Sequence, residues 1–571
     1  MNLFKKNITR NLPRKYEGLH QYQENFRALV EHIGDKHKER QAFVIKENKN
    51  TYKVVTFEDF RRDVRALALI LKERDYLEHP IAVIGKNSYP WMLVYFATLY
   101  AGGVIVPLDK ALKAGEGASS FKRSYSHALF LDEESKELLE ALKSEGVAAA
   151  PTFMNQVMSL VEEGIKAMDD GKQLDLPDID PDKHSVILFT SGTTSQSKAV
   201  LLSQKNILIN AYDAITTEPF TAGQVSMAFL PYHHTFGSTG QVVMLWAGVA
   251  TTYCDGIKYI QKNLVEYKVN IFVGVPLLVE SMYKKILLGI KKEGKEKAFA
   301  KGLIASKALL KVGIDRRRLI FKDVIAKLGG NLTFIITGAS AVDPKALQGL
   351  NDIGITTVQG YGLTESAPIL SAETPEIMRM GSVGKAMPSV EIKLIDVNEE
   401  GVGQLIARGP NIMGGYFENP EDTAKALKDG WLYTGDLASI DKDGFIFIRG
   451  REKNVIVLKN GKNVYPEELE SLMEHLDFVD EVMVYGEPKT AEPEDANNLV
   501  VSCKVVYNKE VMEQVYMAGT HEEISKVVHK AIDKINSSLP EYKHILRIKL
   551  TDVPMIKTST GKVKRFEEVK R

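Results

Sequence analysis

Short apolar runs that end in glycine- or hydroxyl-rich segments are the feature that most constrains how this chain can fold. They recur through residues 1–450 and alternate with longer amphipathic stretches. The runs that we expect to form strands lie at 81–85, 186–189, 270–275 and 332–338. This alternation is typical of an α/β protein, in which ligands bind beyond the carboxyl ends of the strands. The sequence therefore predicts α/β sheets with functional residues in the loops that follow the strands.

The pattern changes toward the C-terminus. The chain first becomes rich in predicted strands, and a smaller α+β unit then begins. In that unit Asn460–Gly461 suits the tight turn of a hairpin, and Pro466 with the acids after it suits the first turn of a helix. We therefore predict a large N-terminal domain at 1–450, made of α/β sheets with a β-rich subdomain, and a small C-terminal domain at 451–571.

Composition excludes some classes of function. The chain has 571 residues, of which 44% are hydrophobic and 26% charged, as expected for globular domains with ample core material. Lys plus Arg and Asp plus Glu both number 74, so nothing global indicates nucleic-acid binding. The two cysteines, Cys254 and Cys503, fit a reducing compartment. The N-terminus lacks the apolar core of a signal peptide, and we expect a cytoplasmic protein.

One uncharged segment, at 90–108, approaches the length of a membrane span. Gly102–Gly103 interrupts it, and the apolar residues before Pro107 are typical of a short buried strand. We expect a core helix, a glycine turn and a strand in place of a membrane span.

The segment 281–330 is strongly basic. It carries 14 Lys or Arg residues against four acids, interleaved with apolar residues. A basic amphipathic helix can lie on an anionic membrane surface, whereas a solvated helical excursion would have the same composition. Both interpretations stay open, and the first predicts peripheral contact with a membrane.

The stretch Thr190–Ser195 has a hydroxyl on five of its six residues, the exception being Gly192, and Lys198 follows. Small residues allow close approach of the backbone, hydroxyls and amides donate to anionic oxygens, and a lysine adds charge. The stretch lacks the spacing of a Walker A loop. It is typical of a phosphate-binding loop, although a polar surface loop would look the same in isolation.

The pair His233–His234 invites a metal hypothesis. The sequence argues against it, because no acid or cysteine stands nearby at ligand spacing and adjacent residues rarely point the same way. A histidine beside glycine-rich backbone can instead donate to a carboxylate or phosphate oxygen. The alternative is a hydrogen-bonded core histidine.

Two later segments suit a nucleotide. Gly360 and Gly362 flank Tyr361, which presents an aromatic face for stacking on a base, while Thr364 and Glu365 supply a phosphate donor and a carboxylate for Mg²⁺.

Acceptor and basic residues follow these segments. Asp436 could accept from ribose hydroxyls, Arg449 and Arg451 stand at the predicted domain junction, and Lys562 lies in a Ser/Thr/Gly loop near the C-terminus. Alone, each would be interpreted as a surface loop, an ion-paired charge or a tail lysine.

Together and in this order, the motifs resemble those of the adenylate-forming superfamily, which includes acyl-CoA synthetases, peptide-synthetase adenylation domains and firefly luciferase. The resemblance runs from about residue 40 to the terminal lysine loop. It implies the adenylate-forming fold, with a small mobile C-terminal domain that closes on the larger one. It also implies a carboxylate that attacks the α-phosphate of ATP, followed by transfer of the acyl group to a thiol.

The resemblance assigns roles residue by residue. It implies catalytic roles for Lys562, His234, Thr364 and Glu365, with Glu365 holding Mg²⁺. It implies an ATP site made of Thr190, Ser191, Gly192, Thr193, Thr194, Lys198, Gly338, Ala339, Ser340, Gly360, Tyr361, Gly362, Thr364, Asp436 and Arg451. Lys453 matches the hinge, and Lys459, Asn460 and Gly461 match the segment that guides the pantetheine of CoA.

Three positions depart from the family pattern. Ser195 and Ala199 stand where glycines are usual, and Asn454 stands where an aspartate is common. The first two would either stiffen the phosphate loop or have no effect, and the third would weaken one salt bridge without removing a catalytic group.

The sequence around the hinge and in the basic segment most resembles that of long-chain fatty acyl-CoA synthetases. The resemblance implies ATP, Mg²⁺ and CoA as cofactors. No carrier domain follows Lys562, so the acceptor is free CoA or a separate holo acyl carrier protein. A medium-chain or aryl acid is an alternative substrate. A catalytically silent nucleotide-binding scaffold is an alternative of another class, against which the presence of Lys562, Glu365 and Thr364 argues.

Overall fold

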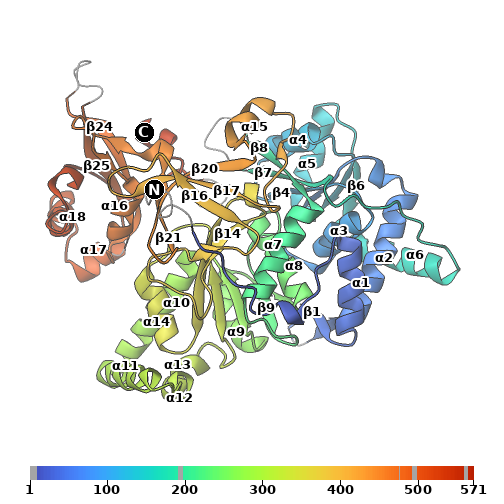
Figure 1. Ribbon diagram of the computed structural model, residues 1–571, viewed down its shortest axis with the longest axis horizontal. Helices are drawn as coiled ribbons and strands as arrows, with labels where there is room; N and C mark the ends of the chain where they lie inside the picture. Colours follow the sequence, from blue (N-terminus) through green and yellow to red (C-terminus); the bar gives the residue numbers. More distant parts are fainter. Residues whose placement is uncertain are drawn as a thin grey trace.

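The structure is a computed structural model in which two helix-covered sheets, a small β-subdomain and a separate C-terminal unit are arranged along the long axis (Figure 1). It describes residues 9–49, 51–190, 197–474, 476–490, 498–557 and 563–570.

The first sheet has seven strands in the order β18-β8-β7-β4-β3-β5-β6. Strands β3 to β7 run parallel, and β8 and β18 add antiparallel neighbours beside β7. The strands are β3 (Ile81–Ile84), β4 (Ile105–Leu108), β5 (Ala128–Leu131), β6 (Ala150–Phe153), β7 (His184–Thr190), β8 (Lys198–Ser203) and β18 (Gly415–Tyr416). The predicted strands at 81–85 and 186–189 are therefore confirmed.

The second sheet has nine strands in the order β15-β14-β13-β12-β11-β9-β10-β1-β2. Its central strands are parallel, and the predicted strands at 270–275 and 332–338 are confirmed as β11 and β12. The strands are β1 (Gln41–Lys46), β2 (Tyr52–Thr56), β9 (Val225–Ala228), β10 (Ala250–Tyr253), β11 (Ile271–Gly274), β12 (Phe334–Thr337), β13 (Thr356–Gly362), β14 (Ile369–Ala372) and β15 (Lys385–Ala386).

Two helices, α7 (Gln204–Thr217) and α8 (Thr235–Trp246), lie between the sheets (Figure 1). Helix α7 packs on β7 and β8, α8 packs on β9 and β10, and the two helices contact each other. Tyr212 and Trp246 meet at this contact, with ring centroids 5.8 Å apart. One continuous apolar core therefore joins both sheets.

The remaining helices of the N-terminal part cover the outer faces of the sheets or connect strands. They are α1 (Phe26–His37), α2 (Phe57–Glu73), α3 (Tyr89–Tyr100), α4 (Ala114–Arg123), α5 (Glu137–Ser144), α6 (Val157–Asp169), α9 (Ile260–Glu266), α10 (Pro276–Lys292), α11 (Glu296–Lys311), α12 (Arg317–Ile320), α13 (Lys322–Ala326), α14 (Pro344–Asp352) and α15 (Pro420–Ala426). The uncharged segment 90–108 forms buried α3, a glycine turn with Gly102 at φ 82°, and β4, as expected. No helix in the described ranges is long and apolar enough to span a membrane.

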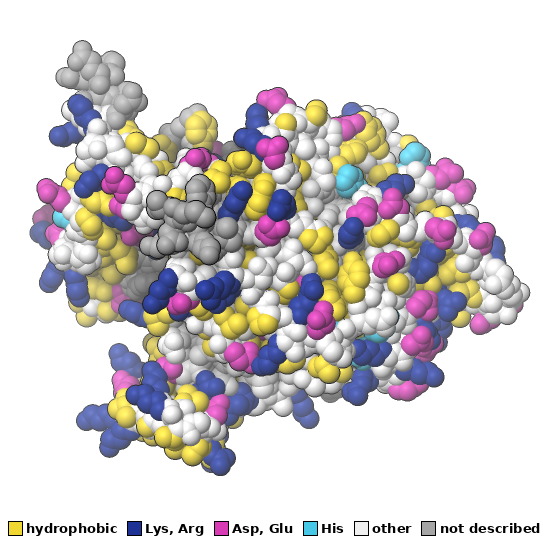
Figure 2. Space-filling view, viewed as in Figure 1, with side chains coloured by type: hydrophobic (Ala, Val, Ile, Leu, Met, Phe, Trp, Pro, Cys, Tyr) yellow, Lys and Arg dark blue, Asp and Glu magenta, His cyan; other side chains and the backbone are white. Residues whose placement is uncertain are grey.

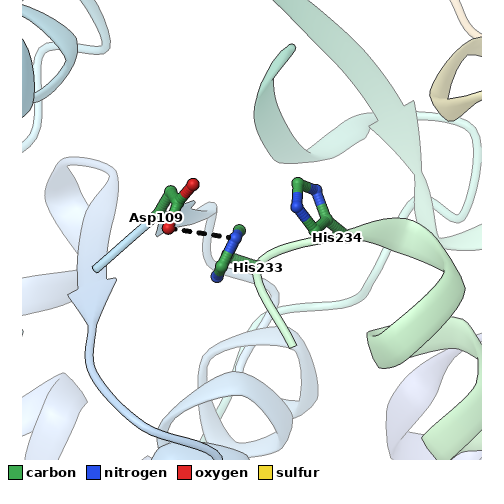
Figure 3. Close-up of side chains that lie close together, drawn as sticks. All are labelled: Asp109, His233 and His234. Atoms are coloured by element: carbon green, nitrogen blue, oxygen red, sulfur yellow. Dashed lines mark ion pairs between the residues drawn. The ribbon is translucent and has the colours of Figure 1, made fainter. Parts of the chain in front are cut away.

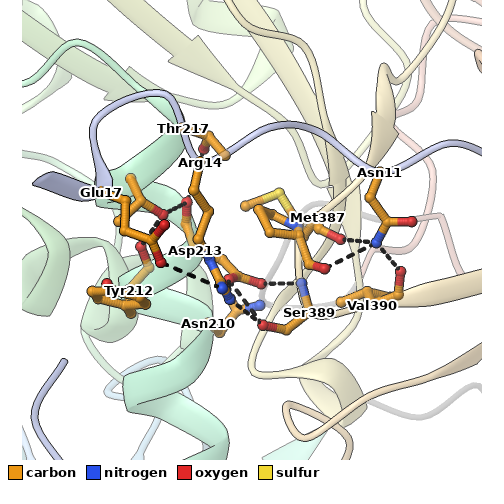
Figure 4. A network of polar contacts seen from close by, with 12 residues as sticks. Asn11, Arg14, Glu17, Asn210, Tyr212, Asp213, Thr217, Met387, Ser389 and Val390 are labelled. Carbon is orange, nitrogen blue, oxygen red and sulfur yellow. Dashed lines mark hydrogen bonds and ion pairs between the residues drawn. The ribbon is translucent and has the colours of Figure 1, made fainter.

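The predicted β-rich segment is a five-stranded sheet of β16 (Glu391–Ile395), β17 (Val402–Arg408), β19 (Leu427–Lys428), β20 (Trp431–Ile440) and β21 (Ile446–Arg451). The N-terminal segment ties it to α7 (Figure 4). Arg14 donates to Asp213 at 2.7 Å and to Ser389 at 2.6 Å, and Asn11 donates to the carbonyls of Met387 and Val390 at 2.8 Å.

After β21 the chain builds a separate apolar core around Leu469, Val484, Cys503 and Val528. The unit contains the hairpin β22 (Ile456–Val457) and β23 (Asn463–Val464), the sheet β24 (Val479–Pro488), β25 (Leu499–Tyr507) and β26 (Arg547–Thr551), and helices α16 (Pro466–Met473), α17 (Lys509–Val515), α18 (His521–Asn536) and α19 (Arg565–Lys570). The predicted hairpin and helix are present. A domain boundary at 450/451 remains a prediction.

Candidate active site

The phosphate-loop candidates begin at the end of β7. Thr190 is its last residue, and its hydroxyl donates to the carbonyl of Lys198 at 3.3 Å. Ser191, Gly192, Thr193, Thr194 and Ser195 lie outside the described residues. Ala199 is buried in β8 opposite Phe189, so this departure from the family glycine belongs to a strand.

Lys198 and Glu365 meet through a tyrosine that sequence analysis missed. The ammonium of Lys198 lies 4.8 Å from the ring centroid of Tyr416 and 3.0 Å from a carboxylate oxygen of Asp422. The Tyr416 hydroxyl donates to Glu365 Oε1 at 2.9 Å. Burial raises the pKa of Tyr416, and the Glu365 carboxylate raises it further, so the phenol remains a donor. Two motifs far apart in sequence are thereby joined.

Tyr361, Asp436 and Arg451 form the second group that the structure brings together. The Tyr361 hydroxyl donates to Asp436 Oδ2 at 2.6 Å, and Arg451 Nε lies 2.7 Å from Oδ1. Tyr361 ends up here because it is near the end of β13, while Asp436 and Arg451 face each other across β20 and β21. Burial and the Asp436 carboxylate raise the pKa of Tyr361 well above its usual value. The pair holds both the ring and the acceptor in place.

The segment Gly338–Ala339–Ser340 follows β12, directly beside this group. Strands β12 and β13 are parallel neighbours, with Thr337 opposite Gln359. A Cβ on Gly338 would lie 2.9 Å from the carbonyl oxygen of Gly360, and Ala339 has φ 75°. The backbone at Gly338 therefore lies close to the strand that carries Tyr361. Thr364 shares the 3-10 turn η7 (Thr364–Ser366) with Glu365.

His234 is the N-cap residue of α8 and lies next to the pair formed by His233 and Asp109 (Figure 3). His233 Nε2 lies 3.3 Å from Asp109 Oδ1, and the His233 and His234 rings are 4.2 Å apart. The ring of Phe236, in the first turn of α8, lies 3.8 Å from the Cβ position of Gly338. The loop that carries the two histidines therefore lies close to Gly338. The premise that no acid stands near the histidines is wrong, because the fold brings Asp109 from β4.

The hinge candidate Lys453 lies in the 3-10 turn η8 (Glu452–Asn454), just after Arg451. Desolvation lowers its pKa, and the positive charges of Arg451 and Lys198 lower it further. The charge of Lys198, the first residue of β8, thus acts on the ammonium of Lys453. Asn454 donates to Glu467 Oε1 at 2.6 Å.

The CoA candidates Lys459, Asn460 and Gly461 form the exposed turn of the β22–β23 hairpin. Gly461 has φ 76°, and its amide donates to the Leu458 carbonyl at 2.8 Å. Within the described chain, no hydrogen bond or ion pair joins this turn to the Tyr361 group. Lys562 lies outside the described residues.

Besides Tyr416, sequence analysis missed Arg123, Asp422 and Asp109. Arg123 donates to the carbonyl of Ser197 at 3.0 Å and stacks 5.2 Å from the Phe189 ring, so it anchors both ends of the phosphate loop. The signals were weak, since a single basic or acidic residue in a helix or after a strand has no motif. Asp109 directly follows the predicted strand before it, which was the one available sign.

Two family models match consecutive parts of the chain. The AMP-binding enzyme family matches residues 30–417, and the AMP-binding enzyme C-terminal domain matches residues 453–571. Long-chain-fatty-acid–CoA ligase FadD15 of Mycobacterium bovis is 25% identical over 530 residues, covering 86% of this chain and 85% of that protein. Human long-chain-fatty-acid–CoA ligase 1 is 30% identical over 451 residues, covering 71% of this chain and 63% of that protein.

Among solved structures, the O-succinylbenzoate coenzyme A synthetase of Bacillus subtilis, in complex with ATP and magnesium ion, superposes with a TM-score of 0.72. Its identity is 19%, with 94% of this chain and 98% of that chain covered. This likeness concerns the fold and confirms the predicted adenylate-forming architecture. The two family matches follow one another and together cover most of this chain. The chain therefore belongs to the family of AMP-binding, adenylate-forming enzymes.

Proposed function

We propose that this protein is an AMP-forming acid–thiol ligase that activates a fatty acid, most suitably a long-chain one, with ATP and transfers the acyl group to CoA. The observation that carries the proposal is the meeting of Lys198 with Glu365 through Tyr416, next to the Tyr361–Asp436–Arg451 group. These two groups supply phosphate, metal and nucleoside contacts from strands of three sheets. The fatty acid is inferred from the names of the relatives.

In the first step the fatty carboxylate attacks the α-phosphorus of ATP, forming the acyl–AMP anhydride and releasing pyrophosphate. Such a reaction needs alignment and cations more than covalent catalysis. We assign the β- and γ-phosphates to Thr190, Ser191, Gly192, Thr193, Thr194 and Lys198, and the α-phosphate to Thr364. His234, at the start of α8, is assigned to the fatty carboxylate.

Glu365 fits a magnesium ligand. Its carboxylate accepts one hydrogen bond from Tyr416, which leaves further lone pairs for a hard cation, and the ion would neutralise charge on the phosphate oxygens.

The adenosine would lie on Tyr361, against the backbone of Gly338, Ala339, Ser340, Gly360 and Gly362. Because the Tyr361 hydroxyl donates its hydrogen bond to Asp436, the ring is held in place before the adenine base binds. We assign the ribose hydroxyls to Asp436, whose Oδ1 lies 2.7 Å from Arg451 Nε.

In the second step a thiol attacks the acyl carbon and AMP leaves. We propose that Lys562 adds a cation during the first step, that Lys453 is the hinge about which the domain 451–571 turns against 1–450, and that Lys459, Asn460 and Gly461 guide pantetheine. A holo acyl carrier protein is the alternative acceptor, and medium-chain or aryl acids are alternative substrates.

The deciding experiment is exchange of labelled pyrophosphate into ATP with a panel of fatty and aromatic acids. Exchange that depends on a long-chain acid is expected, and no exchange with any acid would leave only the nucleotide-binding scaffold. Thioester formation with CoA and with holo carrier protein then identifies the acceptor.

A variant tests the division of labour between the steps. Lys562→Ala should abolish exchange yet leave thioester formation from supplied acyl-AMP largely intact. Lys564→Ala is the matched control, since Lys564 pairs only with the exposed Glu567 at 3.2 Å among the described residues. Equal loss of both half-reactions would contradict the two-step assignment.

We also propose a cytoplasmic protein that contacts anionic membranes peripherally through 281–330. Helices α11 to α13 project from the nine-stranded sheet, with basic and hydrophobic side chains side by side (Figures 1 and 2). Helix α11 packs Phe299, Leu303 and Ser306 inward, and its opposite face carries Lys297, Lys301, Ile304 and Lys311. Ile304 is 71% exposed, and Val312 beyond the helix 70%. Exposed apolar groups among lysines suit a lipid surface of negative charge.

Vesicle flotation tests this contact. The protein should float with phosphatidylglycerol-containing vesicles at low salt and not with phosphatidylcholine alone. Replacing Lys297, Lys301 and Lys311 by Glu should abolish flotation, whereas the same charge change at Lys526, Lys530 and Lys534 of α18 should not. Equal loss in both variants would indicate a general charge effect and would refute this surface.

A further inference from the structure

Asp109, His233 and His234 converge beside the proposed carboxylate site although they come from different sheets (Figure 3). Each offers one potential ligand atom, and these atoms all lie within 4.8 Å of one another. The Asp109 Oδ1 to His233 Nε2 distance is 3.3 Å. His233 is buried, while Asp109 and His234 are partly exposed, so the cluster can be reached from solvent.

The two loops that carry these residues are held by other contacts. Asn87 donates to the Leu230 carbonyl at 2.7 Å and accepts from the Tyr232 amide at 3.0 Å, which fixes the chain just before the histidines. On the other side, the carboxylate of Asp109 accepts from the Ala111 amide at 2.8 Å. The donor positions are therefore set by the fold before any ligand arrives.

We propose that Asp109, His233 and His234 form a binding site for a divalent transition-metal ion of the Zn²⁺ class. Two imidazoles with one carboxylate are a donor set that such ions prefer, whereas Mg²⁺ prefers oxygen ligands. Ligands at about 2.0–2.1 Å from a tetrahedral ion stand roughly 3.3 Å apart, the separation already present between Asp109 and His233. His234, whose ligand atom lies within 4.8 Å of the other two, supplies the third ligand, and water can take the fourth position.

Binding exchanges a proton for the metal. The hydrogen that His233 and Asp109 share in the empty pair must leave, since the metal takes one lone pair from each.

The consequence for the enzyme rests on the proposed function. A metal that takes the imidazole of His234 removes it from the fatty carboxylate, so the ion should inhibit adenylation competitively with the fatty acid and not with ATP. Zn²⁺ would then bind and inhibit the enzyme without requiring bound ATP.

Direct binding to the full-length protein without ATP or CoA tests the site. We expect one Co²⁺ to bind with the visible absorption of a nitrogen- and oxygen-liganded ion, and one Zn²⁺ to displace it. Asp109→Asn and His234→Gln should each weaken binding at least tenfold. His529→Gln is the matched control, because His529 is an exposed histidine of α18 whose ring contacts only its own helix in the described structure.

Binding that is unchanged in Asp109→Asn and His234→Gln would overturn the proposal, as would no binding to the wild type at millimolar Co²⁺. Thermal unfolding gives a second readout, since Zn²⁺ should raise the melting temperature of wild type and control but not of the two variants. If the site binds metal as described but Zn²⁺ inhibition is not relieved by fatty acid, the site stands and the role assigned to His234 fails.

Discussion

Two aspartate–arginine pairs in this molecule have nearly the same geometry and different surroundings. Arg14 and Asp213 are 2.7 Å apart, with 29% and 1% of their side chains exposed, and Arg451 and Asp436 are also 2.7 Å apart, with 38% and 6% exposed. Asp213 additionally accepts from the amide and hydroxyl of Ser389, at 2.9 and 3.0 Å. Asp436 accepts from the Tyr361 hydroxyl.

The difference lies in which elements each pair joins. The Arg14–Asp213 pair joins the N-terminal segment, α7 and the loop before β16 (Figure 4). Around Asp436 the partners are a tyrosine at the end of β13 and an arginine at the domain junction, both beside the proposed nucleotide site. One ion pair therefore joins elements of the fold, and the other belongs to the proposed nucleotide site.

The largest expected effect comes from breaking the structural pair. Arg14→Ala leaves the Asp213 carboxylate buried without its cation, and we expect a loss of about 3 kcal/mol of unfolding free energy, at the low end because the Ser389 contacts remain. Urea denaturation measures it. The kcat of the protein that remains folded should be unchanged, and a selective loss of activity without destabilisation would contradict the comparison.

Breaking the site pair should reverse this pattern. Asp436→Ala removes the proposed ribose acceptor, and hydrogen bonds to a charged group contribute about 1.5–3 kcal/mol each. We therefore expect kcat/KM for ATP in pyrophosphate exchange to fall about 100-fold, with a melting temperature close to wild type. Asp436→Asn, which keeps one acceptor oxygen, should lose less. A large fall in stability with normal ATP use would show that both pairs are structural.

A third buried carboxyl, Glu373, has no arginine beside its carboxylate. It accepts from the amides of Arg379 and Gln359, and burial raises its pKa to about 7. Because the folded state keeps a proton that the unfolded chain loses near pH 4.5, stability should decrease as pH rises from about 4.5 through 7. Glu373→Gln mimics the protonated form, so its melting temperature should exceed that of wild type by roughly 2–4 °C at pH 8 and match it near pH 4.5.

The exposed Glu376 provides the control for that measurement, since Glu376→Gln should leave the pH dependence unchanged. A wild-type protein with the same melting profile as Glu373→Gln from pH 4.5 to 8 would show that Glu373 is ionised in the folded state. An arginine guanidinium beside the carboxylate would then not be the property that distinguishes Asp213 and Asp436 from Glu373.

Local patterns in the amino-acid sequence predict four strands of the two large sheets, and the order of the motifs indicates the family. Apolar runs with the length typical of buried strands identify β3, β7, β11 and β12, and the hydroxyl-rich run that begins at Thr190 identifies a candidate loop. The family motifs point to Gly338 and Tyr361. These signals are local, because strand formation, turn chemistry and a loop motif all depend on neighbouring residues.

The single residues that join those motifs become apparent in the folded protein, where elements distant in sequence pack together. Tyr416 links Lys198 to Glu365, Asp109 reaches His233 from another sheet, and Asp213 became a structural anchor with the chemistry of a site residue. A lone tyrosine or aspartate has no periodicity and no spacing rule. Its role depends on the partners that sheet order and helix packing bring within about 3 Å, and on the burial that strengthens each contact.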